Sequence, residues 1–133
     1  MNHLTEARYA RLTRTGGLDT IEIDHHRFQA AITLQGAHLF HFAPAGDQNW
    51  LWLSPTARFE TGRAIRGGIP ICWPWFGDPA RNPEAVRARL AADDPPAHGF
   101  ARTALWRLAE LSESETGITA ALALEPSGQP GLQ

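Results

Sequence analysis

The side chains best suited to chemistry lie in residues 63–77, which read RAIRGGIPICWPWFG. This stretch holds two arginines, two of the chain's five tryptophans and a phenylalanine. Its Gly and Pro content excludes a helix interior. Aromatic faces can stack on the C–H face of a sugar, and an arginine fork can hold hydroxyl, carboxylate or phosphate oxygens. The stretch therefore fits a ligand-binding wall, and a buried crossing loop with aromatic anchors fits it equally well.

A second stretch, Ala97-His98-Gly99-Phe100-Ala101-Arg102, favours the binding interpretation. His98 follows two prolines and precedes a glycine, so its backbone is held on a sharp turn. A lone histidine is more often a core or turn residue than a functional one. Because Arg102 shares this short turn beside an aromatic loop, we interpret His98 as a candidate functional residue.

The six histidines form no recognisable metal motif. His38 and His41 are three residues apart on a predicted strand, where they are expected to point to opposite faces. The chain has no Cys-x-x-Cys and no His-Glu-x-x-His pattern, so we expect no metal site. The single cysteine, Cys72, lies between apolar neighbours and is interpreted as a small buried residue.

The composition is that of one globular domain. The chain has 133 residues, of which 43% are hydrophobic and 20% charged. Its net charge of −2 and the absence of a Lys/Arg cluster argue against a nucleic-acid partner. No apolar run reaches the roughly 20 residues that cross a bilayer, and the N-terminus resembles no signal peptide. We therefore expect a cytoplasmic protein without a membrane partner.

Alternating apolar residues predict the strands that would position these stretches. The ranges expected as strands are 6–14, 18–24, 28–35, 37–42, 50–53, 104–113 and 117–125. Gly36 is expected to form a bulge or bend, after which the strand continues. Ser54 is expected to cap a short helical turn, and residues 83–92 have the composition of a short surface helix. Together these patterns predict an all-β sandwich or barrel, with a long functional loop between about 54 and 103.

Four segments together resemble the D-hexose-6-phosphate mutarotases, the glucose-6-phosphate 1-epimerases of the aldose 1-epimerase superfamily. The segments are Gln35-Gly36-Ala37-His38-Leu39, Leu51-Trp52-Leu53-Ser54, Arg66 to Gly77 and Ala97 to Arg102. The order and spacing match from about residue 15 to residue 125. The Arg-Gly-Gly-Ile-Pro and His-Gly-Phe-Ala-Arg motifs are the specific part of the resemblance.

The resemblance implies an incomplete β-sandwich of the galactose-mutarotase type, formed by residues 1–133 as one partial domain. It implies interconversion of the α and β anomers of a hexose 6-phosphate such as glucose 6-phosphate, without metal or nucleotide cofactor. By analogy, Arg66, His98 and Arg102 lie in the substrate pocket. In some members a glutamine that contacts substrate precedes the histidine, and Ala97 stands there in this chain. We expect the full-length form to be a monomer.

The resemblance also implies that the family's two catalytic groups lie beyond the position that matches Gln133. The general acid of the family is a histidine in a His-Thr-Tyr type motif, and its general base is a late glutamate. No His-Thr-Tyr occurs in these 133 residues, so the chain is expected to correspond to the N-terminal half of a mutarotase and to be inactive alone. His98 is then the one candidate for a catalytic role. A non-catalytic carbohydrate-binding β-domain is the alternative, and a β-domain without a ligand is the third hypothesis.

Overall fold

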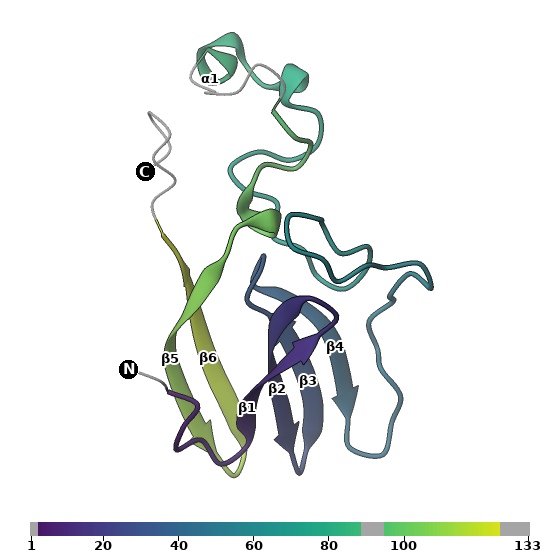
Figure 1. The fold of residues 1–133 in the computed structure, drawn as a ribbon, viewed down its shortest axis with the longest axis vertical. Helices are drawn as coiled ribbons and strands as arrows, with labels where there is room; N and C mark the ends of the chain where they lie inside the picture. Colours follow the sequence, from purple (N-terminus) through teal and green to yellow (C-terminus); the bar gives the residue numbers. More distant parts are fainter. Residues whose placement is uncertain (1–2, 89–94, 126–133) are drawn as a thin grey trace.

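The computed structural model describes residues 3–88 and 95–125 and is built almost wholly from antiparallel strands. Strands β1 to β4 form one sheet in the order β1-β2-β3-β4, and β5 and β6 form a separate hairpin (Figure 1). The strand bounds are β1 Ala10–Thr15, β2 Leu18–His25, β3 Phe28–Thr33, β4 His38–Pro44, β5 Trp106–Ser114 and β6 Gly117–Leu124. The predicted all-β class is confirmed.

The core lies between one face of the four-stranded sheet and the hairpin. Ile21 is fully buried, and Ile23 and Ala30 are buried beside it. Ile21 pairs with Ile32 and Ile23 with Ala30, so alternate residues of β2 and β3 share this face. The hairpin covers them with Leu108, Leu111, Ile118 and Leu122. The alternation in the sequence therefore identified the apolar face of β2 and β3 correctly.

A carboxylate also ties the hairpin to the first sheet. The two oxygens of Glu113 on β5 accept hydrogen bonds from the backbone N–H groups of Arg8, at 2.8 Å, and Tyr9, at 2.6 Å. Close by, Nε2 of the buried His25 lies 2.9 Å from the carbonyl oxygen of Ser114 and donates to it. These bonds fix the tip of the hairpin against the start of β1 and the end of β2.

The connection between β3 and β4 differs from the prediction. The chain reverses direction between Thr33 and His38, with Gly36 and Ala37 both at positive φ, so β3 and β4 are separate antiparallel strands. The irregularity in register lies instead opposite Ala31 and Ile32, where Phe40 is the extra residue of β4. The strand does not continue because the positive φ values of Gly36 and Ala37 turn the chain back, at a point where Gly36 lies close to the backbone of Arg102.

Two further predicted elements are absent from the part of the chain that the structure describes. Residues 50–53 form no strand; Leu53 makes a single bridge to Gly67, and both Trp50 and Trp52 are exposed. Ser54 begins a single turn, in which its hydroxyl accepts from the N–H of Thr56 and its carbonyl from the N–H of Ala57, and no helix follows up to Glu60. Both segments belong to loops, in which Leu53 pairs with Gly67 through one isolated bridge instead of a continuous series of strand hydrogen bonds.

The segment between β4 and β5 is the expected long loop. It contains only three short helical turns in its described part, η1 (Pro79–Arg81), α1 (Glu84–Arg87) and η2 (Ala101–Thr103). The predicted helix 83–92 is thus seen only as α1, and residues 89–94 lie outside the described region. In Figure 1 this loop extends beyond the ends of β4 and β5. In the described part of the chain, no helix is long and apolar enough to span a membrane.

Candidate functional site

Backbone hydrogen bonds join the two motif stretches directly. The carbonyl oxygen of Trp73 accepts from the N–H groups of Phe100, at 3.0 Å, and Ala101, at 3.1 Å. Trp73 and Gly99 form a parallel bridge, and the N–H of His98 donates to the carbonyl of Gly77 at 2.9 Å. The structure therefore brings together two stretches that a long loop separates in the sequence.

The same contacts fix the imidazole of His98. Its Nδ1 accepts a hydrogen bond from the N–H of Gly77 at 2.9 Å, so Nδ1 carries no hydrogen and the hydrogen of the neutral ring is on Nε2. The Phe76 ring lies edge-on to the imidazole at 4.8 Å. His98 also has a φ of 63°, a backbone conformation uncommon outside glycine. Its half-buried side chain therefore offers one N–H donor, at Nε2.

Arg66 opens the Arg-Gly-Gly turn and is exposed. Its carbonyl accepts from the N–H of Ser54 at 3.0 Å, which anchors the backbone rather than the guanidinium. Within residues 3–88 and 95–125 no carboxylate pairs with this guanidinium, as is also true of the exposed Arg27, Arg81 and Arg87. Arginines with a carboxylate partner are Arg8, Arg11, Arg14, Arg58, Arg63 and Arg107. Among the described residues, Arg66 is therefore available to bind an external anion.

Arg102 lies in η2, immediately after the His-Gly-Phe-Ala run. One of its Nη atoms donates to the carbonyl of Ala97 at 3.1 Å, so the guanidinium folds back over the turn that carries His98. Its backbone contacts Gly36 at the end of the first sheet. Arg102 thus connects the second motif to the β3–β4 reversal.

His38 is a residue of this site that the sequence did not single out. It is the first residue of β4, its side chain is 1% exposed, and Nε2 lies 2.6 Å from the carbonyl oxygen of Gly67. Burial lowers the pKa of His38, and the charge of Arg102 lowers it further, while the bond to Gly67 opposes both effects. One imidazole therefore contacts the Arg-Gly-Gly turn and lies within electrostatic reach of Arg102.

The β-bulge corrects the expected geometry of His38 and His41. His38 pairs with Thr33 and His41 pairs with Ala31, two residues apart on β3, so both histidines belong to the same face of the sheet. The prediction of opposite faces was wrong because Phe40 adds one residue between them. Among the described residues no group of three or more His, Cys, Asp or Glu could hold a metal ion.

Of the aromatic residues in the first stretch, one is a buried anchor and two are exposed enough to contact a ligand. Trp75 is a buried anchor, 5% exposed, and its Nε1 donates to the carbonyl of Pro96 at 2.9 Å. Trp73 and Phe76 are 42% and 78% exposed and can offer ring surface to a ligand. Composition could not separate these roles, because all three rings lie close together in the sequence.

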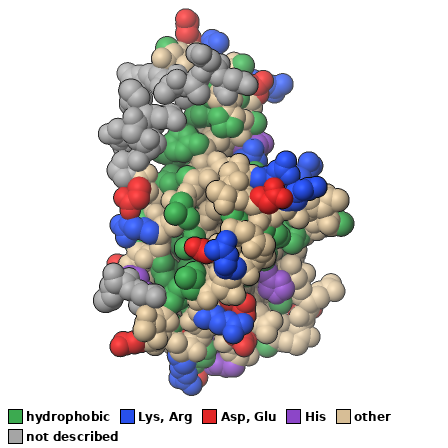
Figure 2. Space-filling view, in the orientation of Figure 1, with side chains coloured by type: hydrophobic (Ala, Val, Ile, Leu, Met, Phe, Trp, Pro, Cys, Tyr) green, Lys and Arg blue, Asp and Glu red, His purple; other side chains and the backbone are tan. Residues whose placement is uncertain are grey.

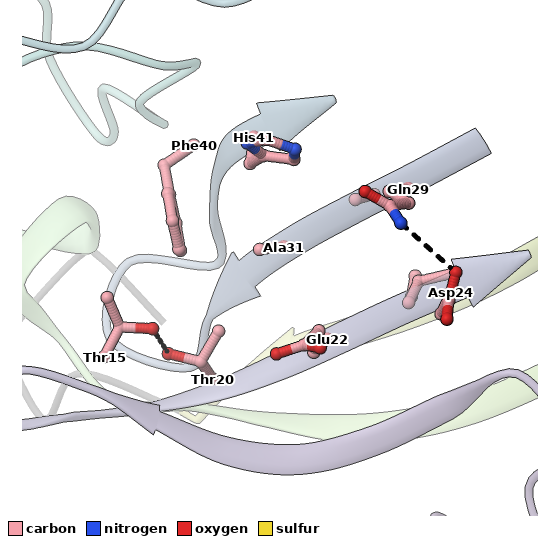
Figure 3. Close-up of a pocket in the computed structure, with 10 residues that line it drawn as sticks. Thr15, Thr20, Glu22, Asp24, Gln29, Ala31, Phe40 and His41 are labelled. Carbon is pink, nitrogen blue, oxygen red and sulfur yellow. Dashed lines mark hydrogen bonds between the residues drawn. The ribbon is translucent and has the colours of Figure 1, made fainter. Parts of the chain in front are cut away.

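A polar hollow of about 290 Å³ lies on the sheet face turned away from the hairpin. Figure 3 shows Glu22, Asp24 and His41 on this face, with the ring of Phe40 at one side. Asp24 accepts from Gln29 at 3.4 Å, and Thr20 donates to Thr15 at 2.9 Å. Its lining includes none of the three predicted site residues, so the hollow and the motif loops are distinct features.

Gln133 marks the limit of the sequence prediction about the catalytic groups. The acid and the base of the family are expected beyond this position, and Gln133 itself lies outside the described residues, which end at Glu125. The position of the family's acid and base beyond Gln133 therefore stays a prediction. What the structure does describe is the pair of linked motif stretches that carry Arg66, His98 and Arg102.

Comparison with known proteins gives a consistent relationship. The sequence model of the aldose 1-epimerase family matches residues 19–132. The chain is 42% identical over 110 residues to a Salmonella typhimurium protein called "Putative glucose-6-phosphate 1-epimerase", and 43% identical over 110 residues to an Escherichia coli protein of the same name. A crystal structure titled as a "putative mutarotase (YeaD)" from Salmonella typhimurium superposes with a TM-score of 0.78 at 37% identity.

These matches cover most of this chain but a minor part of the relatives. The two curated relatives are matched over 83% of this chain and 34% of their own length. The crystal structure is matched over 93% of this chain and 38% of that one. The chain therefore spans only a minor share of the length of the relatives it matches. The expected mutarotase type of β-fold is confirmed by this superposition.

Proposed function

The chain belongs to the aldose 1-epimerase family, and on that premise we propose that it binds a hexose 6-phosphate and serves the interconversion of its α and β anomers. Glucose 6-phosphate is the substrate named for the relatives. The observation that carries the proposal is the guanidinium of Arg66, which has no carboxylate partner among the described residues, together with the linked motif that holds His98 and Arg102.

Each of these side chains has a distinct role in the proposal. Arg66 and Arg102 hold the phosphate or hydroxyl oxygens, because guanidinium groups form charge-assisted bonds to such acceptors. The Nε2–H of His98 donates a hydrogen bond to a sugar oxygen, since Gly77 occupies Nδ1. The exposed rings of Trp73 and Phe76 supply apolar surface for the sugar.

Mutarotation also requires transfer of two protons. In ring opening, the ring oxygen takes up a proton while the anomeric hydroxyl loses one, and the bond between C1 and the ring oxygen breaks. After rotation about the C1–C2 bond, the freed hydroxyl attacks the other face of the aldehyde and loses its proton while the aldehyde oxygen regains one. Arginine remains protonated and cannot perform these transfers. His98 could supply only one of the two groups. We therefore propose that residues 1–133 form one partial domain that holds the substrate, and that the acid–base pair belongs to the part of the fold that only the longer relatives span, beyond the position of Gln133.

Titration calorimetry with glucose 6-phosphate, glucose and inorganic phosphate tests the binding part of the proposal. Glucose 6-phosphate should bind more tightly than glucose. Arg66→Ala or Arg102→Ala should weaken its binding by about 1–3 kcal/mol, the cost of a lost charge-assisted hydrogen bond. Arg107→Ala is the control, because Arg107 pairs with Glu125 on the exposed side of β5. Unchanged affinity in both site variants would overturn the proposed site.

Saturation-transfer NMR of glucose 6-phosphate tests whether residues 1–133 bind the sugar without catalysing anomer exchange. A protein with these 133 residues alone should leave anomer exchange at the rate in buffer, because positioned proton transfer contributes about 10²–10⁴-fold per group. Exchange well above that rate, lost in His98→Ala, would show that the acid–base chemistry lies within this chain.

A non-catalytic carbohydrate-binding domain is the second candidate function. It is favoured by Trp52, which is 68% exposed and whose carbonyl oxygen accepts a hydrogen bond from the N–H of Gly68 in the Arg-Gly-Gly turn. In that case glucose and glucose 6-phosphate should bind equally well, and Trp52→Ala should weaken both. Dependence of binding on the phosphate, with no effect of Trp52→Ala, would exclude this candidate.

A further inference from the structure

The buried imidazole of His38, on β4, forms a side-chain hydrogen bond to the backbone of the Arg-Gly-Gly turn. A carbonyl oxygen can only accept, so the 2.6 Å contact between Nε2 and the carbonyl of Gly67 places a hydrogen on Nε2. The side chain is 1% exposed, so water does not compete for this bond. The donor is carried by the first residue of β4, which pairs with Thr33 of β3.

Positive φ values and close backbone contacts also hold the turn. Gly67 and Gly68 have φ values of 124° and 65°, and a Cβ on Gly68 would stand 2.9 Å from Nε2 of His38 and 2.5 Å from the carbonyl oxygen of Leu39. Backbone bonds run from Gly68 to Trp52 and from Ile69 to Leu39, each at 2.8 Å. The turn is thus held on two sides by backbone and, at Gly67, by the imidazole.

Arg66 immediately precedes the carbonyl that His38 holds. A guanidinium on a long, flexible stem is placed by its own backbone, and here that backbone has a bond at Ser54 and the bond of its neighbour to His38. Loss of the imidazole donor would leave the Gly67 carbonyl without its buried partner and let the turn shift. The direction of the Arg66 side chain would shift with it.

We infer that His38 is a positioning residue for anion binding, acting through the Gly67 carbonyl to hold Arg66 in place. The inference rests on the proposed function, in which Arg66 binds the phosphate or hydroxyl oxygens of the sugar. His38 itself does not touch the ligand. A core histidine that merely fills space would lack this connection to Arg66.

Variants at position 38 distinguish a residue that positions Arg66 from one that only fills space in the core. The calorimetric probe is glucose 6-phosphate. In His38→Gln the amide nitrogen lies as many bonds from Cβ as Nε2 does, so it can reach Gly67 and should restore binding. His38→Asn ends one bond short, and His38→Met has no donor. These two should weaken binding by about two- to tenfold, the range expected for one net hydrogen bond. Thr33→Val is the control, because Thr33 is buried on the same face and its hydroxyl donates to the carbonyl of Gln35.

Combining variants distinguishes this inference from the proposed function. If His38 acts through Arg66, the double variant Arg66→Ala/His38→Met should bind no more weakly than Arg66→Ala alone. An additive loss, or full affinity in both His38→Met and His38→Asn, would overturn the inference. If Arg66→Ala itself binds normally, the proposed site fails instead, whatever the variants at 38 show.

A measurement on the unaltered protein decides the matter if the variants do not fold. Long-range ¹⁵N–¹H NMR of the imidazole should show the hydrogen on Nε2 and a bare Nδ1, and addition of glucose 6-phosphate should shift the Gly67 and Gly68 amide signals. The opposite tautomer, or amide signals at 67 and 68 that do not respond while Arg66→Ala abolishes binding, would contradict the inference.

Discussion

Gly99 lies against Trp73 so closely that a Cβ on Gly99 would overlap the Trp73 carbonyl oxygen. That carbonyl is the acceptor for Phe100 and Ala101, so the close approach and the two hydrogen bonds belong to one contact. Only glycine allows the two motif stretches to meet at this distance. The glycine of the second motif is therefore explained by packing against the first.

Gly99→Ala should be strongly destabilising, and Gly77→Ala is its matched control. Both glycines have positive φ, 71° and 74°, so both variants carry about 1–2 kcal/mol of backbone strain. A Cβ on Gly77 meets nothing within 4 Å, whereas on Gly99 it overlaps backbone, which should add about 1–3 kcal/mol. Urea unfolding measures the difference, and equal losses in the two variants would contradict the observed contact.

Glu113 should contribute more to stability than its neighbour Glu115. Glu113 accepts from two backbone N–H groups, and losing these hydrogen bonds to a charged acceptor in Glu113→Ala should cost about 1.5–3 kcal/mol. Glu115 pairs with Arg8 at 2.7 Å, but both side chains are exposed, so Glu115→Ala should cost less than about 1 kcal/mol. The order of the two unfolding free energies tests this, and a larger loss at Glu115 would refute it.

Stability should fall as the pH drops through the region where histidine titrates. The pKa of His38 in the folded protein is lowered by burial, so below about pH 6.5 the unfolded chain takes up a proton that the folded protein does not. The free energy of unfolding therefore decreases from about pH 6.5 down to the folded-state pKa of His38. Above about pH 6.5 the residue adds no pH dependence.

Urea unfolding between about pH 5 and 8, the range in which histidine titrates, checks this with His38→Gln as the test variant. The variant should lose part of the pH dependence, whereas His26→Gln, at an exposed position, should retain it. Identical slopes for the unaltered protein and His38→Gln would rule out a contribution from His38.

The apolar groove between β1 and β5 should bind hydrophobic dyes. Figure 2 shows hydrophobic side chains gathered over the region between these strands. The groove has a volume of about 430 Å³, and its lining includes Leu12 and Leu105, which are 50% and 70% exposed. Leu105→Lys should reduce dye fluorescence and self-association, because it places a charge in the groove. Phe76→Lys, in the motif loop, is the control, and an equal reduction there would locate the dye elsewhere.

Local sequence alone determined the core-facing side of β2 and β3 and the hairpin of β5 and β6. Ile21 and Ile23 alternate with polar residues because one side of β2 meets the core and the other meets solvent or polar groups, and this period of two is visible without a structure. The hairpin at Ser114–Gly117 could be predicted for the same reason. So could the two motif stretches, because an unusual density of Gly, Pro, Trp and Arg is a property of composition.

Only the tertiary structure decided which of these residues act together. The bulge at Phe40 puts His38 and His41 on one face, and Gly99 brings the His98 turn onto Trp73. Trp75 became a buried anchor while Phe76, one residue on, remained exposed. These outcomes depend on contacts between residues that are far apart in the chain, such as His38 with Gly67. A local pattern records what each residue prefers, whereas such contacts depend on which distant backbone groups lie beside it once the sheet and its loops have packed.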